Sequence, residues 1–162
     1  MTGYRWEVAT DPAEVHDLLC ASDRFQAGRT GTAAPRRNPG STAAHVGAGR
    51  VHLLRDGPLA TAMFTLVDSP PFEAPPDTFP AAGKPVYLTR LAIRPEAAAG
   101  GSLAGMMCVR RAIATASGLG ADALRCEANP ALADTVELLK ALGFTAAGRP
   151  GDVLHLHHVL AS

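Results

Sequence analysis

One continuous stretch, Val86–Phe144, places the strongest constraint on what this 162-residue chain can fold into. It opens with an apolar strand that ends at Pro95, passes through the small-residue turn AAAGGSLAG, and continues as a helix over Ser102–Ser117. A second strand, Leu124–Glu127, and a second helix, Ala131–Leu142, follow at close spacing. A strand that leads through a glycine-rich turn into a helix N-terminus presents unpaired N–H groups and a favourable dipole to a phosphate-sized anion. Without further context, the same small residues also fit a plain tight turn.

The first third of the chain predicts a strand, a helix and a β-hairpin. Tyr4–Ala9 alternates as a strand does, and Asp11 followed by Pro12 is typical of a helix N-cap and first helical residue. Asp-Gly between two apolar runs is a strong hairpin signal. The predicted hairpin consists of Arg50–Arg55, the turn Asp56-Gly57 and Leu59–Val67.

Two segments predict long connections rather than regular structure. Residues 24–48 are rich in Gly, Thr, Pro and Arg, and we expect a mobile segment there, with a short helix as the alternative. Residues 69–85 carry six of the thirteen prolines, which cannot donate to a β-ladder, and therefore predict a loop. Loops of this length in a compact domain usually cover a site.

The C-terminal residues predict a final antiparallel pair, Phe144–Ala147 with Val153–Leu160, around the turn Arg149–Asp152. The resulting order, β-α-β-β-β-α-β-α-β-β, favours a single α/β domain over residues 1–162. We expect a mixed α+β sheet, mostly antiparallel, with helices on both faces.

Composition excludes several classes of partner. The 15 basic and 15 acidic residues balance, which argues against a nucleic-acid partner. No apolar run approaches the ~20 residues of a membrane span, so no membrane is expected. The three cysteines, Cys20, Cys108 and Cys126, are far apart and predict reduced, buried thiols in a cytoplasmic protein.

The strand ending Leu91-Ala92-Ile93-Arg94-Pro95, followed by Gly101 in the small-residue turn, resembles the acyl-coenzyme A binding half of the GNAT superfamily of N-acyltransferases. The resemblance spans nearly the whole chain and implies a GNAT-like fold with a splayed parallel strand pair. It also implies acetyl-CoA (or another acyl-CoA) as co-substrate, with residues 86–144 as the binding core and residues 24–48 and 69–85 as variable loops on the acceptor side. The implied cofactor-binding residues are Leu91, Ala92, Ile93, Ala99, Gly100, Gly101, Ser102, Leu103, Ala104 and Asn129. For Asn129, an Asx turn before Pro130 is the alternative.

The sequence departs from the family pattern at four functional positions. Ala98 stands where the family has Arg or Gln, and Leu103 stands where it has Gly or Ala. Thr89 replaces the glutamate that often serves as general base, and Leu139 replaces the tyrosine that often serves as general acid. The loop therefore retains a recognisable but degenerate form, and both usual proton carriers are missing.

Other residues could carry the chemistry. Tyr87 shares a strand face with Thr89, and Glu127 lies on the second strand, so the candidate catalytic residues are Tyr87, Thr89 and Glu127. His155 and His157 share a face of the last strand and could act as a base or bind a metal, although packed histidines are the plainer interpretation. Arg90 fits either a substrate carboxylate or an ion pair.

The resemblance implies an enzyme that transfers an acyl group, expected to be acetyl, from coenzyme A to a small-molecule amine without a metal. The neutral amine would attack the thioester directly, and a homodimer is possible through the final strands. The alternative is a GNAT fold used for other chemistry or for ligand binding without catalysis.

Overall fold

The computed structural model describes residues 3–75, 78–100 and 103–161. Over these residues seven strands form one mixed sheet in the order β1-β2-β3-β4-β5-β7-β6. Neighbouring strands whose register is recorded run antiparallel, apart from the parallel pair β4–β5. The mixed α/β class predicted from the sequence is confirmed. The chain divides into two compact units, Met1–Thr65 with Arg90–Cys108, and Leu66–Thr89 with Val109–Ser162.

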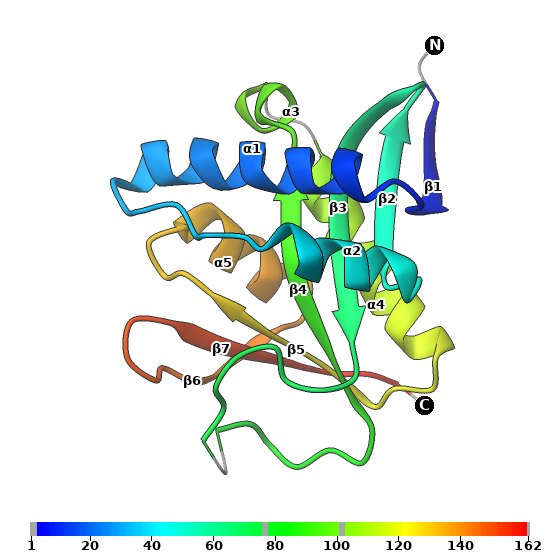
Figure 1. Cartoon of the computed structure of the whole chain (residues 1–162). Coiled ribbons are helices and arrows are strands. Elements are labelled where there is room, and N and C mark those ends of the chain that lie inside the picture. Colours follow the sequence, from blue (N-terminus) through cyan, green and yellow to red (C-terminus); the bar gives the residue numbers. More distant parts are fainter. Residues whose placement is uncertain (1–2, 76–77, 101–102, 162) are drawn as a thin grey trace. The chain divides into compact units, whose positions relative to one another are not determined.

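The first unit contains three antiparallel strands, of which the second and third form a hairpin. These strands are β1 (Tyr4–Val8), β2 (Val51–Asp56) and most of β3 (Leu59–Val67), and the hairpin turn lies at Asp56-Gly57 as predicted. Helices α1 (Pro12–Thr30) and α2 (Pro39–Gly47) run side by side over the hairpin (Figure 1). Apolar side chains from both helices and both hairpin strands form one core, and their burial stabilises this arrangement by about 25 cal/mol for each Å² removed from water. That core includes Val15, Leu18, Leu19, Val46, Val51, Leu53, Met63 and Ala92.

Asp11 begins α1 as its side chain predicts. The carboxylate Oδ1 accepts hydrogen bonds from the N–H groups of Ala13 and Glu14, at 3.1 and 3.4 Å, and Pro12 occupies the first helical turn. These contacts satisfy backbone donors that have no acceptor within the helix.

The second unit contains the parallel pair. The first residues of β4 (Pro85–Ile93) pair with β5 (Ala123–Ala128), and β5 pairs antiparallel with β7 (Leu154–Val159). β7 in turn pairs with β6 (Thr145–Gly148), and α5 (Ala133–Ala141) connects β5 to β6. The segment between β3 and β4 has no helix or strand in its described part, residues 68–75 and 78–84, as its prolines predict.

The structure differs from the sequence prediction between residues 24 and 48. Instead of a mobile segment, α1 continues to Thr30 and α2 follows. Asn38 caps α2 by accepting a 2.8 Å hydrogen bond from the N–H of Gly40, and Pro39 follows it. Asn38-Pro39 is the same helix N-cap signal as Asp11-Pro12, but the surrounding Gly and Thr residues favour a loop.

A second difference concerns the turn after β4. Residues predicted as a loop form a short helix, α3 (Pro95–Ala99), and α4 (Ala104–Gly118) begins two residues later than predicted. Pro95 explains the early helix, because its fixed φ favours the first helical position.

Among the described residues, no helix is long and apolar enough to cross a membrane.

Candidate functional site

A row of polar side chains crosses three strands of the second unit. Tyr87 of β4 lies opposite Arg125 of β5, and Arg125 lies opposite His157 of β7. Facing residues on paired strands project from the same side of a sheet, so the register alone brings the three side chains together. All three are buried, with exposed fractions of 4%, 8% and 4%.

Arg125 is the centre of this row. It donates to the Tyr87 hydroxyl at 2.9 Å, to Nδ1 of His157 at 3.3 Å and to the carbonyl of Pro80 at 2.5 Å. Its guanidinium carbon also lies 4.8 Å from the centre of the Phe79 ring. A buried cation is costly unless its donors are satisfied, and here hydrogen bonds and an aromatic face take the place of a carboxylate.

The same contact defines the protonation of His157. Because Nδ1 accepts from Arg125, the ring proton of the neutral imidazole lies on Nε2. Burial lowers the pKa of His157, and the neighbouring Arg125 charge lowers that pKa further. His157 is therefore neutral, so no second positive charge is buried beside Arg125.

Glu127 and His155 form a second cross-strand pair. His155 Nε2 lies 3.1 Å from the Glu127 carboxylate, while His155 itself is fully buried. Its other ring nitrogen, Nδ1, is buried and has no hydrogen-bond partner among the described residues. Phe79 stacks on this imidazole at 4.9 Å and Phe72 contacts it at 4.8 Å. This pair was not predicted from the sequence, because Glu127 lies on β5, far from His155 in sequence.

The loop between β3 and β4 covers these side chains with aromatic rings. Phe72 and Phe79 both contact Tyr87, at 5.9 and 6.4 Å between ring centres. The end of the loop is held by Asp122, whose carboxylate accepts from the N–H groups of Gly83 and Lys84 at 2.7 and 2.8 Å. The loop that was predicted to cover a site therefore packs over candidate catalytic residues.

The first unit holds a second polar cluster around Arg90. This residue has φ +53°, and no other described non-glycine residue has a positive φ. An arginine in the left-handed region costs free energy, of order 1–3 kcal/mol, and such residues concentrate at functional sites. Its NH1 donates to Oγ1 of Thr42 at 3.0 Å, and Thr42 Oγ1 also lies 2.9 Å from Nδ1 of His16.

The turn after β4 keeps the small residues that the resemblance requires. Ala97, Ala98 and Ala99 lie in α3, where the N–H of Ala98 donates to the Arg94 carbonyl. A Cβ on Gly100 would lie 3.1 Å from the carbonyl oxygen of Glu96, which leaves little room for a larger residue. Gly101 and Ser102, both predicted to bind the cofactor, lie outside the described residues.

Leu103 does not fill the start of α4. Its side chain is 65% exposed, whereas the following Ala104 is almost fully buried. The N–H group of Met107 donates to the carbonyl of Leu103 at 2.9 Å, whereas those of Gly105 and Met106 have no acceptor within the helix by its geometry. The described residues at this turn therefore fit an anionic group such as a pyrophosphate.

Two further predicted cofactor contacts have partners of their own. The N–H of Ile93 donates to the Ser22 hydroxyl at 3.1 Å, so a ligand would compete with Ser22 for this donor. The Asn129 side chain accepts a 2.9 Å hydrogen bond from the N–H of Ala131, which is the Asx turn that was left open as an alternative. The flanking Leu91 is half-buried and Ala92 is buried.

The two positions without the usual proton carriers differ in environment. Thr89 is half-buried on β4. Leu139 is 2% exposed in α5 and packs in the apolar interior, so nothing at that position can donate a proton.

The buried thiols of Cys108 and Cys126 have pKa values raised by burial to about 12, so both stay protonated. Within the described chain, no group of three or more His, Cys, Asp or Glu side chains could hold a metal ion.

Comparisons with known proteins identify the fold. No model of a protein family matches the chain, and no curated protein sequence matches it. Solved structures do match. A putative acetyltransferase from Salmonella typhimurium with its cofactor acetyl-CoA matches with a TM-score of 0.67 and 17% identity over 98% of this chain and 95% of that chain.

Two other matches cover the chains equally well. A putative phosphinothricin N-acetyltransferase has a TM-score of 0.71 and 13% identity, over 99% of this chain and 100% of that chain. The ribosomal-protein-S18-alanine N-acetyltransferase of Escherichia coli has a TM-score of 0.70 and 15% identity, over 100% and 96%. A GNAT-family acetyltransferase from Streptococcus agalactiae also matches, with a TM-score of 0.72 and 14% identity over 99% of this chain and 97% of that chain. The chain therefore has the fold of the GNAT acetyltransferases, as its sequence resemblance implied.

Proposed function

We propose that this protein is an N-acyltransferase that transfers an acetyl group from acetyl-CoA to the amine of a small molecule. The observation that carries the proposal is the end of β4. There the strand leads through a small-residue turn to the start of α4, and Leu103 points to solvent rather than into the turn. The matched structures support the same activity, because all four are described as acetyltransferases and one contains acetyl-CoA.

Acetyl-CoA would be held mainly by backbone groups. The N–H groups at the start of α4 would bind the pyrophosphate, in place of the arginine or glutamine side chain that Ala98 lacks. The backbone of β4 around Leu91 would bind the pantetheine arm. When bound, acetyl-CoA supplies the thioester whose acyl group the amine accepts.

Proton transfer would fall to Tyr87, Glu127 and Thr89 rather than to a dedicated base. The Tyr87 hydroxyl accepts from Arg125, so its own hydrogen remains available to a second acceptor. Glu127 keeps a partly exposed carboxylate beside His155 and can exchange protons through water. Thr89, which follows Tyr87 on the same strand face, would position water or the amine.

The activity test is release of free thiol from acetyl-CoA by the purified protein in the presence of a panel of amines. We expect amine-dependent thiol release, and we expect Tyr87→Phe to lower kcat by about 100- to 10,000-fold, as the loss of a proton-transferring group does. Arg149→Gln, in the exposed turn before β7, is the matched control and should keep the wild-type rate. Equal rates for wild type and Tyr87→Phe would remove Tyr87 from the mechanism.

Leu139 favours a second candidate function. Because a buried leucine stands at the position of the usual acid, the fold could bind acetyl-CoA without catalysing transfer. Tight binding of acetyl-CoA with no thiol release for any amine would select this second function.

A further inference from the structure

We propose that Arg90 binds an oxyanion of the acceptor, so that the amine substrate also carries a carboxylate or a similar group. This inference rests on the proposed acyl transfer and adds the chemical class of the acceptor. A guanidinium with free donors matches the two oxygens of a carboxylate, phosphonate or phosphate, and an amino acid is the simplest molecule that joins such a group to an amine.

The first argument is charge. Arg90 is half-buried, and within the described part of the chain it makes no ion pair. Its charged neighbours are Arg37 and Asp23, and Asp23 is already engaged by Arg37 through two hydrogen bonds of 2.7 and 3.1 Å. Two guanidinium groups thus share one carboxylate, which leaves one positive charge uncompensated. Partly buried charges are normally paired, so an anion is the missing partner.

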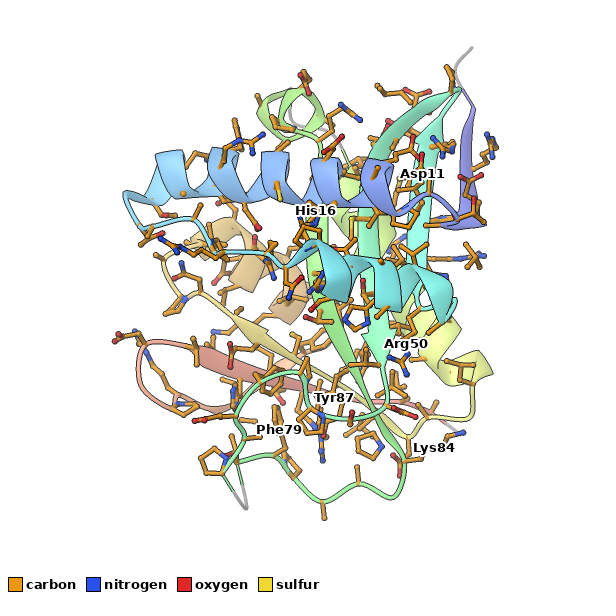
Figure 2. The ribbon with its side chains drawn as sticks, in the orientation of Figure 1. Asp11, His16, Arg50, Phe79, Lys84 and Tyr87 are labelled. Atoms are coloured by element: carbon orange, nitrogen blue, oxygen red, sulfur yellow. The ribbon has the colours of Figure 1, made fainter. Side chains whose placement is uncertain are left out.

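The second argument is that the guanidinium is aimed by a built network. Thr42, which is 1% exposed, accepts from Arg90 NH1 and lies within hydrogen-bond distance of His16. His16 projects from α1 toward α2, and its other ring nitrogen lies 3.5 Å from Sγ of Cys20 (Figure 2). One N–H of Arg90 is committed to Thr42, so the direction of the guanidinium is fixed while its other donors stay available.

The third argument is the backbone. Arg90 adopts φ +53° although glycine would take this conformation without strain. A strained backbone that places an unpaired charge beside a fixed hydrogen-bond network is what substrate positioning requires. Nearby His45 adds a buried Nδ1 without a partner among the described residues. Burial and the Arg90 charge lower the pKa of His45, so this ring is neutral and can donate to a bound oxyanion.

The anion is not expected to belong to coenzyme A. Arg90 precedes Ile93 by three strand residues, about 10 Å at 3.3 Å per residue, and α3 separates Ile93 from the start of α4. The pyrophosphate proposed at α4 therefore lies beyond the end of β4, and we expect it to be separate from the Arg90 side chain. An oxyanion at Arg90 then belongs to the other substrate.

The test compares matched acceptors on the full chain. The standard amino acids, the amines left when their carboxyl group is removed, and the corresponding aminophosphonates are each assayed by thiol release from acetyl-CoA. Wild type, Arg90→Gly, Arg90→Lys and the exposed-residue control Arg36→Gln are compared. Arg90→Gly removes the charge and also suits φ +53°, so loss of folding does not confound the result.

We expect kcat/KM of wild type to be higher for an anionic acceptor than for its decarboxylated partner, by about 10- to 100-fold. Arg90→Gly should lose this preference and leave the rate with the decarboxylated amine and the dissociation constant of acetyl-CoA unchanged. Arg90→Lys should recover part of it, and Arg36→Gln should behave as wild type. The ratio between carboxylate and phosphonate acceptors identifies which oxyanion is used.

Two outcomes of this assay would overturn the inference. Equal rates with anionic and decarboxylated acceptors would remove the oxyanion while leaving acyl transfer intact. A weakened affinity of Arg90→Gly for acetyl-CoA would assign the anion to the cofactor. If wild type neither binds acetyl-CoA nor releases thiol, the proposed function fails by itself. Calorimetric titration with the same amino acids then decides the oxyanion site, through binding that Arg90→Gly loses or through no binding at all.

Discussion

At the scale of single residues, Arg125 shows how the second unit keeps a buried cation without a carboxylate. Tyr87, His157 and the Pro80 carbonyl take its hydrogen bonds, and Phe79 lies over its charge. Each residue alone has an unremarkable place in the sequence. Only the register of β4, β5 and β7 brings them into one row, and pairing between strands far apart in sequence cannot be read from local patterns. For the same reason the Glu127–His155 pair was not predicted, although Glu127 and His155 were each candidates.

The residue-scale prediction concerns His157 and pH. Its pKa is lower in the folded protein than the ordinary 6.5, so the unfolded chain binds the proton more readily. The stabilising contribution is complete above about pH 6.5 and is lost as pH falls below it, through the lowered pKa of the folded state. His45 contributes with the same sign. His157→Gln, which keeps an acceptor for Arg125, should show a smaller loss of stability in chemical denaturation over this range than wild type. Arg36→Gln, at an exposed residue without a titration near this pH, serves as control. Parallel pH curves for wild type and His157→Gln would show that His157 does not cause the loss of stability.

At the scale of elements, the predictions succeeded where a local signal exists. Asp11-Pro12 begins α1, Asp56-Gly57 closes the hairpin, and the prolines between β3 and β4 exclude helix and strand from residues 69–75 and 78–84, because each effect acts within a few residues. α2 was expected only as the alternative to a mobile segment, although Asn38-Pro39 carries the cap signal, since its buried face consists of Thr42 and Val46 only. The positive φ of Arg90 has no sequence signal, because nothing local distinguishes an arginine that is strained from one that is extended.

The element-scale prediction concerns the loop between β3 and β4. Asp122→Ala removes the acceptor of the Gly83 and Lys84 N–H groups and should loosen the end of the loop. We expect faster hydrogen exchange at the amides of residues 83 and 84 and weaker protection of Phe79, without unfolding of the sheet. Asp152→Ala, in the exposed turn before β7, is the control. Unchanged exchange at residues 83 and 84 would show that the aromatic contacts of Phe72 and Phe79 hold the loop by themselves.

At the scale of the whole molecule, the GNAT fold was predictable from the order of its elements and from the ending of β4. The structure bears this out along the full chain. The acceptor was not predictable, because the matched proteins share the fold and differ in the molecules that their descriptions name. The specificity that we propose for Arg90 rests on contacts with Thr42 and His16, which lie far from Arg90 in sequence and become visible only in three dimensions.

The acyltransferase function requires that the protein binds acetyl-CoA, and calorimetric titration of the purified chain with acetyl-CoA measures this binding. We expect one binding site with a dissociation constant on the order of micromolar, which corresponds to a binding free energy of about −8 kcal/mol. The affinity should weaken when Gly100 is replaced by a larger residue that crowds the carbonyl of Glu96. No heat of binding at millimolar acetyl-CoA, with a protein that unfolds cooperatively, would contradict both the pyrophosphate site at α4 and the acyltransferase assignment.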